Sequence, residues 1–275
     1  MKNPKSSAKL EKAKTFKELK SALDNERKEL VENLLEKKWF KKTRFDLQKQ
    51  LLTLPEEFDG FLMDLGNRPE EIGQVEILAL EKLAVGNYLA IPVFKVRSLL
   101  TNEVYTYEYA SWKYGKYTGF RGILFVEVDN QIKFFITRKA EKFAIADRIY
   151  DAFGGLDLKF SSDRFINLPL QVENRLKNLL ALKNLRFKRF IDLGLFSPDA
   201  GLTNEKVGLF AAIINLEDAK LIESRFNTNK NVSKTPTYEL GIYPIERMFE
   251  MVAKSDDSFF LACVARLMAL NIIKL

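Results

Sequence analysis

The sequence predicts an α+β protein, with a mixed sheet between helices and a helical extension at the N-terminus. Residues 9–40 contain no Gly or Pro, and their apolar residues recur at helical spacing. From about residue 74 the pattern changes to short alternating segments separated by turn residues, which is typical of strands. Helical spacing returns in the last 30 residues. We therefore expect a helical extension at 1–57 and a larger α+β domain at 70–275.

The strands are predicted from alternation and from the turns that bound them. Gly86-Asn87 lies between two alternating segments and indicates a hairpin, and Asp129-Asn130 indicates a second tight turn. Residues 217–236 are polar and rich in turn residues, so we expect a loop there. The expected strands are 74–85, 88–98, 103–112, 119–128, 131–137, 190–197 and 206–215, and the later helices are 168–185, 244–252 and 256–272.

The composition excludes several kinds of chemistry. The 275 residues include no histidine and one cysteine, Cys263, which lies within an apolar run. Ser-His-Asp and Cys-His catalysis are therefore impossible, and a zinc site lacks its commonest ligands. Any metal would be a hard cation held by oxygen, such as magnesium or manganese. We expect Cys263 to be a buried core thiol.

Membrane and export signals are not expected. No apolar segment follows Met1, and the longest apolar stretch, 259–273, carries Arg266. This stretch is shorter than the roughly 20 residues that a membrane span needs. The expected location is the cytoplasm, with no membrane partner.

The positive charge is concentrated at the N-terminus. Residues 1–50 hold 15 Lys and Arg against 8 Asp and Glu, whereas the whole chain holds 44 against 37. The remaining residues are therefore neutral overall. This segment could bind nucleic acid, dock on an acidic protein surface, or form a solvated helical hairpin whose aromatic residues pack on the core. The residues concerned are Lys37, Lys38, Lys41, Lys42 and Arg44, around Trp39 and Phe40.

Five segments, in the right order, resemble the ADP-ribose pyrophosphatase branch of the Nudix hydrolases. One is a strand pair around Asp129-Asn130, and another is an apolar approach to Gly154-Gly155. The resemblance covers about three quarters of the chain, and it implies an α/β/α Nudix fold over 70–275. It also implies a homodimer, because the N-terminal strands of the family commonly form a dimer interface. The segments are 121–138, 149–157, 192–211, 245–252 and 261–270.

The Nudix box itself departs from the family pattern. The family motif G-x5-E-x7-R-E-U-x-E-E-x-G-U places carboxylates on one face of a helix, where they hold magnesium against a pyrophosphate. Here the distance from Gly155 to Lys177 is about eight residues too long. The acidic positions lack carboxylates, so we expect no metal, no cofactor and no Nudix catalysis. The residues at the box positions are Ser161, Lys177, Asn178, Ala181 and Leu182.

Several residues near the expected pocket could still bind a ligand. Arg138 and Lys139 lie where the family places phosphate-binding cations, although ordinary strand-end charges are the plainer interpretation. Asp157, Asp199 and Glu205 could contact a ribose, could hold a relocated magnesium or manganese, or could be solvated loop acids. Gly154 and Gly155 complete the candidate pocket.

Three functions therefore compete. The first is a catalytically inactive Nudix-fold protein that works as a binding, scaffold or interaction module and keeps a nucleotide pocket of the ADP-ribose type. The second is a divergent metal-dependent hydrolase of nucleoside diphosphate derivatives that uses the loop carboxylates. The third is a nucleic-acid-binding protein that uses residues 1–50.

Overall fold

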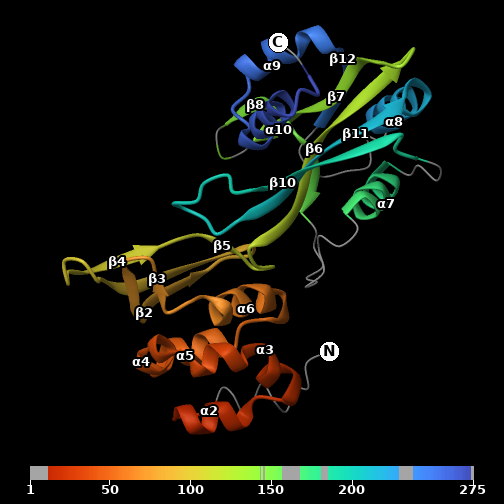
Figure 1. The fold of residues 1–275 in the computed structure, drawn as a ribbon. Coiled ribbons are helices and arrows are strands. Elements are labelled where there is room, and N and C mark those ends of the chain that lie inside the picture. Colours follow the sequence, from red (N-terminus) through yellow and green to blue (C-terminus); the bar gives the residue numbers. More distant parts are fainter. Residues whose placement is uncertain are drawn as a thin grey trace. The chain divides into compact units, whose positions relative to one another are not determined.

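The structure is a computed structural model, and it describes residues 12–142, 144, 146–156, 168–180, 185–228 and 238–273. The described residues form two compact units. Unit 1 contains residues 12–118 together with the segment 199–205. Unit 2 contains the described residues from 119 to 198 and from 206 onward. Each unit has its own buried apolar clusters. Figure 1 labels the helices and strands that form the two units.

Unit 1 begins with a series of short helices. Two of them have side-chain N-caps, since Thr15 accepts a hydrogen bond from the Glu18 amide and Asp24 accepts one from the Arg27 amide. Their apolar stripes face a shared core. The helices are α2 (Phe16–Ala22), α3 (Asn25–Glu36), α4 (Lys38–Lys42), α5 (Phe45–Leu52), η1 (Glu56–Phe58) and α6 (Asp59–Asn67).

A five-stranded sheet completes unit 1. Its main order is β1-β2-β3-β4, and β5 pairs with β3 beyond the end of β4. All of these pairings are antiparallel. The strands are β1 (Glu71–Ile72), β2 (Val75–Val85), β3 (Leu89–Ser98), β4 (Val104–Glu108) and β5 (Ser111–Trp112).

The helices and the sheet of unit 1 share one core. Trp39 of α4 is fully buried and meets Phe94 of β3 edge to face, with ring centroids 5.2 Å apart. Leu34 and Leu51 join the same apolar cluster as Leu80 of β2. The sequence suggested a boundary between residues 57 and 70, whereas the structure places residues 12–118 in one unit. The helices bury their apolar faces against β2 and β3 instead of forming a separate extension.

Unit 2 contains a seven-stranded sheet. Its main order is β10-β11-β6-β7-β12, with β8 paired to β7 and β9 paired to β6. Asp129 and Asn130, both with positive φ, form the turn between the two long central strands. The strands are β6 (Tyr117–Val128), β7 (Gln131–Lys142), β8 (Asp147–Asp151), β9 (Phe153–Leu156), β10 (Arg189–Phe196), β11 (Lys206–Asn215) and β12 (Tyr238–Pro244).

Helices cover both faces of this sheet. On one face, Val172 of α7 (Leu168–Leu180) and Ile222 of α8 (Leu216–Thr228) pack against Leu124 and Phe210. On the other face, α9 (Met248–Ala253), which follows the short helix η4 (Ile245–Arg247), and α10 (Ser258–Ala269) pack against alternate residues of the same strands (Figure 1). The α/β/α layering of an α+β protein is thus confirmed. Cys263 of α10 is buried, as expected, and burial raises the pKa of its thiol to about 12.

One prediction for this region was wrong, and one strand was missed. Residues 216–228 form helix α8, although the sequence suggested a polar loop, because only one narrow face, including Ala219 and Ile222, needs to be apolar to cover the sheet. Strand β12 was not expected, yet its backbone pairs with β7 from Phe134 to Ala140. Leu240 and Ile242 alternate with Glu239 and Gly241 and pack in the core of the sheet, so the signal for this strand was present but short.

The structure contains no helix, within the described residues, that is long and apolar enough to cross a membrane.

Candidate functional site

The strand pair β7–β8 places oppositely charged residues opposite each other inside unit 2. Arg138 and Asp151 are register partners in this antiparallel pair. Asp151 is fully buried and Arg138 is 8% exposed. Ile149 and Asp151 lie on the same inward side of β8, two residues apart. The sheet register therefore carries a carboxylate into the interior, where it needs charged partners.

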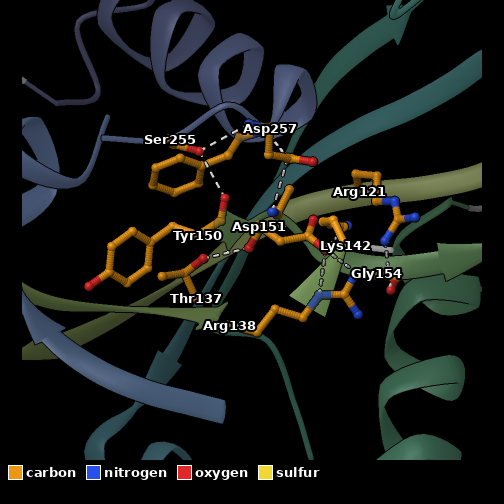
Figure 2. A network of polar contacts seen from close by, with 11 residues as sticks. Arg121, Thr137, Arg138, Lys142, Tyr150, Asp151, Gly154, Ser255 and Asp257 are labelled. Carbon is orange, nitrogen blue, oxygen red and sulfur yellow. Dashed lines mark hydrogen bonds and ion pairs between the residues drawn. The ribbon is translucent and has the colours of Figure 1, made fainter. Parts of the chain in front are cut away.

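Three cations surround this carboxylate (Figure 2). Arg138 donates to Oδ2 of Asp151 from Nε and from Nη2, at 3.0 and 2.6 Å. Lys142, on the same strand, donates to the same oxygen at 2.6 Å. Arg121 of β6 adds its positive charge nearby, while its Nη1 donates to the carbonyl of Gly154 at 3.1 Å. Three cations thus act on this one carboxylate.

The burial of Asp151 and its cationic partners act in opposite directions on its pKa. Burial acts to raise the pKa, because it disfavours the charged form. The charges of Arg138, Arg121 and Lys142 outweigh this effect, so the pKa of Asp151 is lowered below its ordinary value of 3.8. Asp151 is therefore ionised at neutral pH, and Arg138 and Lys142 are held in place by charge-assisted hydrogen bonds.

A second buried carboxylate, Asp257, lies at the N-terminus of α10. Its Oδ1 accepts hydrogen bonds from the amides of Phe260 and Ala152, at 2.7 and 3.3 Å. Burial, followed by the charge of Asp151, raises the pKa of Asp257 above its ordinary value. Asp257 thus ties α10 to the end of β8.

The backbone around the cluster is fixed by further contacts. Thr137 donates its hydroxyl to the carbonyl of Asp151 at 2.6 Å, and Ser255 donates to the carbonyl of Tyr150 at 2.8 Å. Gly154 has a φ of +148°, and a Cβ atom there would lie 2.2 Å from the carbonyl oxygen of Phe120. Glycine is therefore required for β9 to approach β6. Gly155 follows it in β9, opposite Phe120.

The predicted ligand-binding residues are not all brought together. Arg138 and Gly154 belong to the cluster. Lys139 points to the other side of β7, where its Nζ lies 5.6 Å from the ring centroid of Tyr150. Asp199 accepts two amide hydrogen bonds within its own turn, and Glu205 accepts one from the hydroxyl of Thr118 at 2.6 Å. These two acids belong to unit 1, and Asp157 lies outside the described residues.

The described box positions do not fit a magnesium ion. Lys177 of α7 pairs with Glu173 at 2.6 Å, and Asn178 is exposed. Burial acts to raise the pKa of Glu173, but Lys177 and Arg186 outweigh it, so the pKa is lowered. The box positions on α7 thus offer an ammonium group and one neutral amide, which cannot replace a set of carboxylates. Ser161, Ala181 and Leu182 lie outside the described residues. In the part of the chain that the structure describes, no group of three acidic or cysteine side chains could hold a metal.

The basic cluster of unit 1 does not form a single cationic surface. Lys41 pairs with Glu36 at 2.8 Å, and Arg44 pairs with Asp46 at 2.9 Å. Lys38 lies 3.9 Å from Glu70. Lys42 is exposed and Lys37 is half-buried. Trp39 and Phe40 are fully buried, so these rings cannot stack on nucleic-acid bases, and they pack on the core as the third interpretation of this segment expected.

The sequence interpretation missed Asp151, Asp257, Lys142 and Arg121. One signal for Asp151 was present, because the acid follows the inward-facing Ile149 by two residues and therefore lies on the same side of the strand. Nothing in the sequence links it to Asp257, 106 positions further along the chain. The fold and this site define an α/β/α domain with a cation-rich buried cluster beside a Gly-Gly strand.

Comparisons with known proteins assign no family to the chain. No protein-family model matches it, and no curated protein matches it. A solved structure described as "Crystal structure of ADP compounds hydrolase" is similar, with a TM-score of 0.48 and 12% sequence identity, over 74% of this chain and 100% of that one. The match is distant, and it assigns neither a ligand nor a reaction to this chain.

Proposed function

We propose that the chain is a Nudix-like protein that acts by binding and does not catalyse metal-dependent hydrolysis. The cations around Asp151 would form the phosphate-binding part of a nucleotide pocket. The observation that carries this proposal is the gathering of three cations, Arg121, Arg138 and Lys142, around one place in unit 2. A diphosphate group would complement cations gathered in this way.

Lys142 is the residue best placed to meet a ligand. Its side chain is 31% exposed, whereas that of Arg138 is 10% exposed. An ammonium group has three N–H donors, and one of them goes to Asp151. Arg138 would then act as the buried support that fixes Asp151, while Lys142 reaches both the carboxylate and a phosphate.

The composition of α7 supports binding over catalysis. Nudix hydrolysis needs a magnesium cluster to activate water, and the described box positions Lys177 and Asn178 supply no carboxylate. The cation cluster could instead neutralise phosphate charge directly, and it would do so without a metal. A nucleotide would then be held but not cleaved.

Isothermal titration calorimetry with ADP-ribose tests the proposal. We expect the same affinity with EDTA and with magnesium, because no metal bridges the ligand to the protein. Lys142→Met should weaken binding by about 10- to 100-fold, which corresponds to the loss of one charge-assisted hydrogen bond of roughly 1.5–3 kcal/mol. Lys133→Met is the matched control, since Lys133 is an exposed lysine near the other end of β7, and it should bind as the unmodified chain does.

Hydrolysis assays with magnesium or manganese complete the test. Phosphate-ester products above background, with loss of activity in Glu205→Ala, would contradict the proposal and favour the divergent hydrolase that uses loop carboxylates. No binding of ADP-ribose, NAD or inorganic pyrophosphate by the folded chain would contradict the nucleotide pocket itself.

A further inference from the structure

Strand β4 forms an open edge of the sheet in unit 1. The sheet order ends at β4, and within the described residues no strand pairs with its outer side. Beyond the strand, the amide of Ala110 donates to the carbonyl of Leu202 at 2.8 Å, so the segment 199–205 occupies the edge from that point onward. The open edge therefore extends from Val104 to Glu108.

This edge lacks the features that usually prevent strand addition. Natural sheets protect their edges with Lys, Pro, β-bulges or covering segments. The residues Val104–Glu108 contain no Lys or Pro, and their pairing with β3 runs from Val93 to Arg97 without a register shift. All five residues are exposed. As far as the described residues go, the edge thus presents a regular row of backbone groups to another strand.

Apolar side chains are concentrated along the same edge. Val104, Tyr105 and Tyr107 are 51%, 42% and 40% exposed, and Leu100 in the preceding turn is 76% exposed. Tyr107 donates its hydroxyl to the carbonyl of Gly201 at 3.1 Å, which holds this side chain against the segment 199–205. A fixed tyrosine loses little conformational freedom when a partner covers it.

The charges at the two ends of the edge are both negative. Glu103 precedes β4 and Glu108 ends it, and both are exposed. The cations of the neighbouring strand pair elsewhere, since Lys95 lies 4.0 Å from Glu81 and Arg97 pairs with Glu76. In the part of the chain that the structure describes, no ion pair joins a cation to Glu103 or Glu108. The edge is therefore an apolar strand bounded by two acids.

We propose that β4 binds an extended segment of a partner protein as an added strand, with apolar or aromatic residues at the centre of the segment and Lys or Arg at both of its ends. Backbone hydrogen bonds would supply affinity, and the end charges would supply selectivity.

Charge disfavours a second copy of the chain as the occupant. A full antiparallel overlap of residues 103–108 with their own copy places Glu103 opposite Glu108 at both ends. A parallel overlap places each glutamate beside its counterpart. Like charges opposite each other destabilise a strand pair, whereas a basic-ended segment places opposite charges at both positions.

Synthetic peptides test the proposal on the full chain. The probe is a fluorescein-labelled peptide with alternating Val, Thr and Tyr between two lysines at each end, and the comparison peptides carry glutamates in place of the lysines or N-methyl groups on alternate amides. By fluorescence anisotropy we expect the lysine peptide to bind at least ten-fold more tightly than the glutamate peptide. N-methylation should abolish binding, and hydrogen exchange should slow at 104–108 in the complex.

A charge exchange on the protein sharpens the test. The double variant Glu103→Lys with Glu108→Lys should reverse the preference between the two peptides, and both positions are exposed, so the fold is retained. Glu71→Lys, on the strand at the opposite edge of the sheet, should leave the preference unchanged. Equal affinity for both peptides, binding that survives N-methylation, or self-association that Thr106→Lys abolishes would each overturn the proposal.

Discussion

Two regions of this chain are rich in cations, and they differ in what surrounds the charges. In unit 2, Arg138 and Lys142 both donate to one oxygen of the buried Asp151. In unit 1, Lys41 and Arg44 pair separately with the exposed acids Glu36 and Asp46. The first region contains a few cations drawn together by sheet register, whereas the second contains many that stand apart on helix surfaces.

This difference in surroundings decides which of the two groups of cations can contribute strongly to binding a ligand. Water and salt screen the separate pairs of unit 1, so each contributes little. The cluster of unit 2 lies in the protein interior, where the same charges interact strongly and keep a fixed geometry. A high density of Lys and Arg along the sequence therefore pointed to unit 1, where the charges are less suited to binding than those of unit 2.

The largest expected effect tests what the aromatic residues of the N-terminal basic cluster do. Trp39→Ala should lower the free energy of unfolding by about 3–5 kcal/mol, because it removes a fully buried side chain and leaves a cavity. Denaturation in urea measures this loss. Tyr88→Ala, at a position that is 62% exposed, is the control and should change stability by about 0.5 kcal/mol or less. A similar, small change for both variants would contradict the burial of Trp39 and would favour its role as a surface binding residue.

The next effect tests the buried cluster. Asp151→Ala should cost about 3 kcal/mol, because it leaves the buried Arg138 without its counter-ion. This value is at the low end of the range for buried pairs, since the Lys142 side chain is 31% exposed and can turn to water. Thermal and urea unfolding measure the loss. Stability within about 1 kcal/mol of the unmodified chain would show that this cluster resembles the surface pairs of unit 1.

A pH series sharpens the comparison further. The folded pKa of Asp151 lies below its ordinary value of 3.8, so its charged form stabilises the fold at higher pH. The stability difference between the unmodified chain and Asp151→Asn should be fully present above about pH 5 and should shrink as the pH falls through 3.8 toward the folded pKa. Urea unfolding at pH 7, 5, 4 and 3 measures it. A difference that grows toward low pH would contradict the assigned direction.

The smallest effect is expected at the surface pairs of unit 1. Arg44→Ala should change the free energy of unfolding by less than about 1 kcal/mol, because the side chains of Arg44 and Asp46 are 70% and 65% exposed. Raising the salt concentration should remove even this difference. A loss comparable to that of Asp151→Ala would mean that the surface cluster is more tightly organised than its exposure indicates.

Much of the fold could be predicted from local pattern. Gly86 and Asn87 identified the hairpin of β2 and β3, and Asp129 and Asn130 identified the turn between β6 and β7. Helix α8 was not predicted in this way, because its largely polar sequence becomes a helix by packing one narrow face on the sheet. Strand β12 was overlooked because its alternating segment is short. The candidate site was likewise only partly predictable from the sequence. Arg138 could be proposed from its place at a strand end, but its counter-ion could not.

The sequence by itself determined the elements that local chemistry specifies, and it excluded histidine and zinc chemistry by composition. The tertiary structure decided which charges meet. The register of β7 and β8 places Asp151 between Arg138 and Lys142, and the N-terminus of α10 brings Asp257 to the same strand end from 106 residues away. The physical reason is that turns and helical spacing depend on adjacent residues, whereas a buried ion cluster depends on strand pairing and helix packing across the whole domain.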